Sequence, residues 1–136
     1  MTTFRRRSTY GATLSALGGP TVSTNASSYP LGSTITVTYA NLPGNQKDWI
    51  AIAAAGSPNT SFVSWVYTNG QTSGTATFTA PAGGTYVARA FLNNGLMLLA
   101  ESATFLVATS TISTDSATYT PGATVTVTYA GLPGNE

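Results

Sequence analysis

The chain has 136 residues and a net charge of +1, and only 7% of its residues are charged, against about 25% in a typical soluble domain. It contains no cysteine and no histidine, which excludes disulfides, thiolate metal sites and the commonest general base of enzymes. Its four carboxylates are few for paired-carboxylate chemistry or for a calcium site, which needs at least about six oxygen ligands. We therefore expect neither enzymatic activity nor a cofactor or metal.

Residues 1–20 differ from the rest and are expected to form an N-terminal arm. Three of the five positive charges lie here, at Arg5, Arg6 and Arg7, so the remainder lacks the basic surface that nucleic-acid binding needs. A mildly apolar stretch follows, so the arm is either a cleaved secretion signal or a retained segment whose arginines contact an acidic partner. No apolar run approaches the roughly 20 residues of a membrane span.

Alternation of apolar and polar side chains begins after the arm and predicts β-strands. In residues 33–40, Ile35, Val37 and Tyr39 alternate with threonines and are expected to face a core. In residues 48–54 the next strand is expected to bury Ile50 and Ile52, while Trp49 covers a sheet edge or end on the other face.

A polar turn separates these two strands. The Leu-Pro-Gly-Asn run at 42–45 has the residue types that a tight turn requires, which favours a turn over a ligand-binding loop. Lys47 and Asp48 are neighbouring charges in a chain that has few. We expect them to be a solvated pair beside the strand, with Asp48 bonding loop amides.

Two further strands follow, separated by the turn signal Asn-Gly at 69–70. Their alternation gives the side chains expected to point inward. In residues 61–68 these are Val63, Trp65 and Tyr67, and in residues 74–80 they are Ala76 and Phe78.

Residues 85–92 predict the next strand, with Tyr86 placed where a Greek-key sandwich has its tyrosine corner. The side chains expected to face inward are Tyr86, Ala88, Ala90 and Leu92. Val87, Arg89 and Phe91 then point outward, and two exposed apolar residues beside an arginine are typical of an interface patch. A tight hairpin at 93–95 leads to a final strand that includes Ala103, Phe105 and Val107.

The pattern predicts an all-β, immunoglobulin-like antiparallel sandwich of about seven strands over residues 21–108. Residues 21–46 then return at 111–136, ninety positions later, with 15 of 26 aligned positions identical. We therefore expect residues 109–136 to be a truncated second repeat that holds only the first two strands.

The pattern YxxGxTxTVTYxxLPGNxxDWIxI, at 29–52, continues through Trp65, the Asn-Gly turn, GTYVARAF and FLNNG. It resembles an immunoglobulin-like, fibronectin-like module of bacterial secreted and surface proteins, often found beside phosphoesterase-type hydrolase domains. The DWIxI element is also similar to the SKICH domain. The resemblance covers residues 21–108 and, in truncated form, 111–136. It implies an accessory, spacer or interaction module without catalytic residues.

The half-repeat is the strongest functional clue, because two strands cannot cover their own apolar side chains. Three outcomes are open: the chain is a fragment of a longer array, the strands add to a neighbouring subunit as donor strands, or they pack back on their own module. The candidate interface residues are Val87, Arg89, Phe91, Val125, Val127, Tyr129, Leu132, Arg5, Arg6 and Arg7.

Two functions are consistent with these features. The first is a structural subunit of an extracellular or particle-surface assembly, a virion surface included, that self-associates as a homo-oligomer or filament through its terminal segments. The alternative is an accessory module of a larger secreted hydrolase that binds a glycan or a cell surface, with Trp49 and Phe91 as candidate exposed aromatics.

Overall fold

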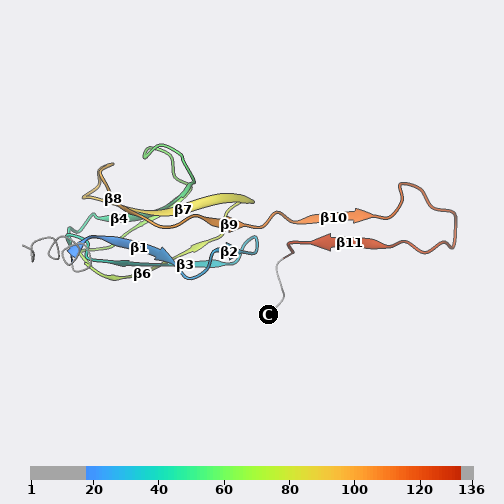
Figure 1. Ribbon diagram of the computed structural model, residues 1–136, viewed down its shortest axis with the longest axis horizontal. Coiled ribbons are helices and arrows are strands. Elements are labelled where there is room, and N and C mark those ends of the chain that lie inside the picture. The colour runs from blue at the N-terminus through green and yellow to red at the C-terminus, as the bar shows by residue number, and fades with distance from the viewer. Residues whose placement is uncertain (1–17, 133–136) are drawn as a thin grey trace, which may run out of the picture.

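The computed structural model of the protein describes residues 18–132 and shows two facing β-sheets with a separate β-hairpin at one end (Figure 1). Arg5, Arg6 and Arg7 lie outside the described residues. The first sheet has the order β1-β3-β6, formed by Thr21–Thr24, Thr34–Ala40 and Gly74–Thr79. The second has the order β2-β9-β7-β4-β5, formed by Ser28–Tyr29, Phe105–Val107, Gly84–Phe91, Trp49–Ala54 and Ser64–Tyr67. Strand β8, Leu98–Glu101, also pairs with β7.

This strand order confirms the predicted immunoglobulin-like sandwich. Strands β1, β3 and β6 take the positions of strands A, B and E, while β4, β7 and the β8–β9 segment take those of C, F and G. Every pair is antiparallel except β2 with β9, which is parallel. The sandwich has nine strands rather than about seven, because residues 21–29 and residues 98–107 each form two short strands.

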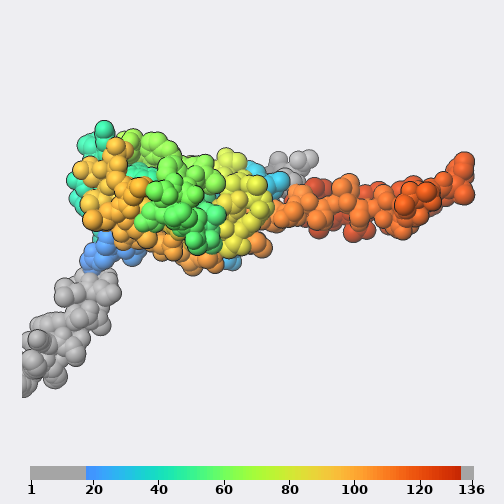
Figure 2. Space-filling view, turned by 90° about the horizontal axis from the view of Figure 1, so that it is seen from above, coloured from blue at the N-terminus to red at the C-terminus, as the bar shows by residue number. Residues whose placement is uncertain are grey.

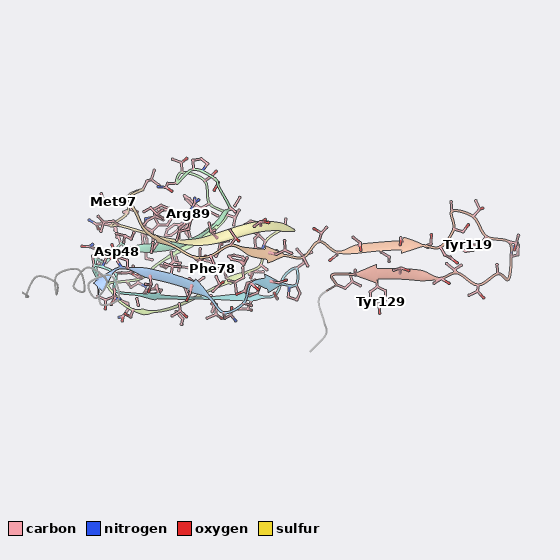
Figure 3. All side chains as sticks on the ribbon, in the orientation of Figure 1. Asp48, Phe78, Arg89, Met97, Tyr119 and Tyr129 are labelled. Carbon is pink, nitrogen blue, oxygen red and sulfur yellow. The ribbon has the colours of Figure 1, made fainter. Side chains whose placement is uncertain are left out.

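The predicted core residues fill the space between the sheets. Ile35, Val37, Ile50 and Ile52 are fully buried there, and Figure 3 places Phe78 between the two layers. The tyrosine corner is also confirmed, since the Tyr86 hydroxyl donates a hydrogen bond to the carbonyl of residue 82 at 2.7 Å. For β3 and β6, period-two alternation was sufficient because one face of each strand is apolar and the other is not.

The prediction for strand β5 was wrong. Val63 and Trp65 were expected to face inward, yet both are exposed, Trp65 at 44%. The register explains this difference, because Trp65 lies opposite Ala51 and Tyr67 lies opposite Trp49. Side chains directly opposite one another share a face of the sheet. Trp65 and Tyr67 therefore lie with Trp49 on the outer face, away from the core.

Asp48 is fully buried, so the expected solvated pair is wrong for Asp48, while its predicted bonding to loop amides is confirmed. One carboxylate oxygen accepts the backbone N–H groups of Gly44 and Asn45 at 3.0 and 2.9 Å. The other accepts the Asn45 amide at 3.1 Å and the Asn93 backbone N–H at 2.9 Å. Asp48 thereby joins the turn before β4 to the loop after β7, while Lys47 stays exposed.

We expect Asp48→Asn to destabilise the fold nearly as much as Asp48→Ala, by about 3–5 kcal/mol. Both carboxylate oxygens face N–H donors, so the NH2 group of an asparagine would meet a donor in either orientation. Urea unfolding of both variants measures this cost. Lys47→Ala is the control and should change stability by less than about 0.5 kcal/mol. An Asp48→Asn variant as stable as the parent chain would contradict the role assigned to the carboxylate.

Candidate interaction surfaces

The three residues predicted to form an outward patch on β7 do lie on the outer face, but they are not exposed. Val87, Arg89 and Phe91 are each at most 4% accessible. Trp49 covers Phe91, with the rings stacked at a centroid distance of 4.3 Å and an angle of 20°. The expectation of an exposed patch here is therefore wrong, because side chains from β4 and a loop cover this strand.

Arg89 attaches that loop to the sheet. Its Nε donates to a Glu101 carboxylate oxygen at 2.7 Å, across the pair of strands β7 and β8. Its terminal nitrogens donate to the backbone carbonyls of Ser57 and Pro58 at 2.8 and 3.3 Å. These contacts satisfy a buried guanidinium and position the segment between β4 and β5, so Arg89 has a structural role.

An aromatic cluster covers the outer face of the second sheet next to this loop. Trp49 is its centre, with Phe62 and Trp65 packed edge-on against it at centroid distances of 5.1 and 6.0 Å. The Trp49 indole N–H donates to the Gly95 carbonyl at 3.0 Å. Trp49 is 6% exposed, as expected for a residue that covers a sheet, and Phe91 beneath it is buried. Neither is therefore the exposed aromatic that a binding module would use.

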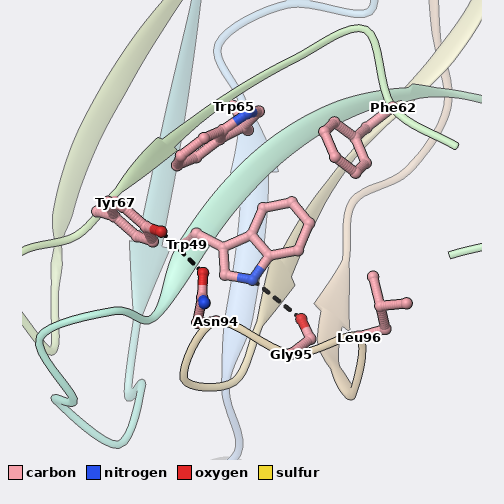
Figure 4. A pocket seen from close by; sticks show the side chains of 7 residues that line it. All are labelled: Trp49, Phe62, Trp65, Tyr67, Asn94, Gly95 and Leu96. Atoms are coloured by element: carbon pink, nitrogen blue, oxygen red, sulfur yellow. Dashed lines mark hydrogen bonds between the residues drawn. The ribbon is translucent and has the colours of Figure 1, made fainter. Parts of the chain in front are cut away.

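Beside the cluster lies an open cleft of about 240 Å³ (Figure 4). Its lining consists of Trp49, Phe62, Trp65, Tyr67, Asn94, Gly95 and Leu96. Trp65 and Tyr67 meet edge to face at 74°, and the Tyr67 hydroxyl donates to the Asn94 side-chain carbonyl at 2.7 Å. None of the lining side chains is charged. The cleft thus combines aromatic surface with one hydrogen-bonded polar edge.

Sequence reasoning missed this cleft because it assigned Trp65 and Tyr67 to the core. A usable signal was present, since Phe62, Trp65 and Tyr67 place three aromatic rings within six residues. The large side chains of the core come from other strands, so these three aromatic residues were not needed to fill the core.

The second surface is the hairpin of β10 and β11, Thr111–Thr114 and Val127–Ala130. Thr111 pairs with Ala130 as Thr21 pairs with Ala40, so the second repeat reproduces the register of β1 and β3 ninety residues on. Figures 1 and 2 show this hairpin projecting from the end of the sandwich. It does not pack back on its own module, which removes one of the three outcomes considered from the sequence.

The apolar face of the hairpin is exposed, as predicted for Val125, Val127, Tyr129 and Leu132. Ile112 is 73% exposed and Tyr129 is 65% exposed, whereas their first-copy counterparts Val22 and Tyr39 are buried. The same sequence pattern is therefore a core surface in one copy and an uncovered surface in the other.

The far end of the hairpin also repeats the local structure of the first copy. Asp115 accepts hydrogen bonds from the Tyr119 hydroxyl and from the backbone N–H of Thr126, as Asn25 does from Tyr29 and Thr36. The Tyr119 bond, followed by the Thr126 bond, lowers the pKa of Asp115 below its ordinary value.

Residues 18–132 contain no group of three potential metal ligands, and no helix within that range is long and apolar enough to cross a membrane. The sequence matches no protein-family model and no curated protein. Among solved structures, the crystal structure of CHIR-AB1 is similar, with 20% identity, a TM-score of 0.43, and 68% of this chain and 99% of that chain covered. The superoxide reductase (neelaredoxin) from Ignicoccus hospitalis T24K follows with 18% identity, a TM-score of 0.41, and coverage of 71% and 86%. These similarities are too weak to carry an argument, so the immunoglobulin-like assignment rests on the strand order.

The two tryptophans provide a direct test of the arrangement on the outer face. In Trp65→Phe the remaining Trp49 should emit at shorter wavelength and resist quenching by acrylamide, because it is 6% exposed. In Trp49→Phe the remaining Trp65, at 44% exposure, should emit at longer wavelength and be quenched readily. Steady-state fluorescence of the two variants checks this. The reverse order of quenching would show that β5 presents its other face.

The hydrogen bonds of Asp115 predict a pH dependence at the end of the hairpin. Its pKa is lowered on folding, so its contribution to stability is present above the unfolded pKa and is lost as pH falls through the folded pKa. Tyr119→Phe should raise the pKa of Asp115 toward its ordinary value, which a carboxyl-carbon NMR titration measures. Asp115→Asn restores the residue of the first copy and should remove the pH dependence. Equal titration curves for Tyr119→Phe and the parent chain would contradict the assignment.

Proposed function

We propose that the protein is a non-catalytic structural subunit of an extracellular or particle-surface assembly, in which the β10–β11 hairpin joins one sandwich to the next. The observation that carries this proposal is the exposed apolar face of the hairpin. In the first copy, the corresponding side chains form a large part of the sandwich core. An exposed apolar face of this kind favours binding to a partner that removes it from water.

The exposed apolar side chains of the hairpin support a weak contact. Five side chains of the second copy are about half exposed or more, whereas the residues at the corresponding positions of the first copy are buried. The five are Ile112, Val125, Val127, Tyr129 and Leu132. Completing the burial of each contributes about 1 kcal/mol, which gives on the order of 5 kcal/mol before the entropy cost of association. That value suits a repeated, cooperative contact in an array better than an isolated dimer.

The pairing of β3 with β6 in the sandwich shows which strand is complementary to β11. In the sandwich, β3 pairs with β6 over six residue pairs, from Thr34 with Thr79 to Tyr39 with Gly74. Strand β11 repeats the sequence of β3, so it is matched in register and in side-chain pattern to the β6 strand of another unit. In an intact sandwich that edge of β6 is occupied by β3, so the other unit must offer a β6 edge that its own β3 leaves free. That unit is either a neighbouring subunit that accepts donor strands or a further repeat of an array.

A charge placed on the apolar face of the hairpin should abolish association. The parent chain is expected to form oligomers or fibres whose size increases with concentration, whereas Val127→Asp and a chain ending at Thr109 should be monomeric. Light scattering after size-exclusion chromatography over a wide concentration range, with negative-stain images, measures both.

Thr128→Asp is the matched control, because Thr128 lies on the same strand and points to the opposite face. It should associate like the parent chain. A parent chain that is monomeric at every concentration would overturn the joining of subunits by donor strands, as would equal disruption by Thr128→Asp and Val127→Asp.

A further inference from the structure

We propose that the cleft on the outer face of the second sheet, between Trp65, Tyr67, Asn94 and Leu96 over Trp49, binds a neutral glycan. This site lies on the sandwich, on different residues from the hairpin surface, so the proposal is independent of self-association. It assigns a ligand class to the aromatic cleft from three features: a rigid floor, aromatic walls and a polar edge without charge.

The floor of the cleft is fixed before any ligand binds. Trp49 is stacked on Phe91, flanked edge-on by Phe62 and Trp65, and held by the hydrogen bond from its indole N–H to the Gly95 carbonyl. It has little freedom to lose on binding. Preorganisation of this kind preserves affinity, because the cost of ordering side chains is met during folding.

The polar edge is equally well held. Asn93 and Asn94 adopt left-handed backbone conformations, with φ of 43° and 60°, which asparagine tolerates better than most residues. Their N–H groups donate to the Asp48 carboxylate and to the Lys47 carbonyl at 2.9 and 2.8 Å. The buried carboxylate therefore fixes the loop that carries the Asn94 side chain to the cleft.

The hydrogen-bonding capacity of this edge matches a hydroxyl-bearing ligand. The Tyr67 hydroxyl donates to the Asn94 side-chain carbonyl, which leaves the Asn94 NH2 group as a donor and the Tyr67 oxygen as an acceptor. Both residues line the cleft (Figure 4). A sugar ring has one face of C–H groups, which packs on an aromatic ring, and hydroxyls around its edge, which exchange hydrogen bonds with such a pair.

Charge and size restrict the ligand further. No lining residue is charged, so a carboxylate or phosphate would lose its hydration without gaining a cationic partner. A volume of about 240 Å³ is below the roughly 300–1,000 Å³ of sites for drug-sized molecules. It suits one or two rings of a chain that continues through the open side of the cleft.

A second copy of this chain is the competing occupant, because Leu96, Met97 and Val63 add apolar surface near the cleft. The apolar face of a hairpin would cover Trp65 but would leave the Asn94 NH2 group without an acceptor. An unpaired polar group in a contact costs about 1–3 kcal/mol in proteins generally, which favours the hydroxyl-bearing ligand.

The test uses the full chain and a panel of neutral polysaccharides: cellulose, chitin, xylan and mannan. Pull-down on the insoluble polymers and affinity electrophoresis with the soluble ones measure retention. The parent chain should bind at least one of them, and Trp65→Ala should weaken that binding by about tenfold or more. Asn94→Gly, which keeps the left-handed backbone conformation and removes the amide, should also weaken it.

Tyr129→Ala is the matched control, since it removes an aromatic side chain that is exposed at 65% on the other surface. It should bind glycan like the parent chain even where it reduces self-association, which separates the two proposals. Circular dichroism establishes that each variant is folded.

Three results would overturn the glycan proposal: no retention on any neutral polysaccharide, equal retention of the parent chain and Trp65→Ala, or binding restricted to anionic polymers such as polygalacturonate. Loss of self-association in Trp65→Ala without glycan binding would identify a second copy as the occupant instead.

Discussion

The buried carboxylate of Asp48 is the interaction on which both the fold and the cleft depend. A charge in a protein interior is costly unless hydrogen bonds replace its hydration, and four N–H donors do so here. Those donors come from the turn before β4 and the loop after β7, so Asp48 joins its own turn to a loop 45 residues later in the chain. The same loop supplies Asn94 and Gly95 to the cleft. The geometry of the surface therefore follows from an interaction made for folding.

Burial on both faces distinguishes β4 and β7 from the other strands. Their inner residues belong to the core, while Trp49, Ala51 and Phe91 form a second, smaller cluster on the outside. Arg89 completes this outer layer because its guanidinium bonds the loop between β4 and β5 to the sheet. The result is a rigid aromatic floor, and the exposed rings of Phe62 and Trp65 extend it toward solvent. Rigid aromatic surface of this kind is a common starting point for recognition.

The two copies of the repeat separate local from tertiary determinants of structure. Both adopt the same strand register and the same turn, with Tyr119 bonded to Asp115 as Tyr29 is to Asn25. Their burial differs completely, since the first copy is covered by a second sheet and the second is not. The hairpin pattern is thus set by alternation and turn chemistry, whereas the use of its apolar face depends on what packs against it.

The sequence by itself determined the sandwich, the inner faces of β3, β4, β6 and β7, the tyrosine corner and the exposed face of the half-repeat. These follow from the period of the strands and from the repeat, both of which are local properties. Only the tertiary structure decided that Asp48 and Arg89 are buried, that Val87 and Phe91 are covered, and that Trp65 faces outward. Where both faces of a strand are apolar, alternation separates the faces but does not identify the buried one. That choice depends on cross-strand register and on loops distant in sequence, which the local pattern does not contain.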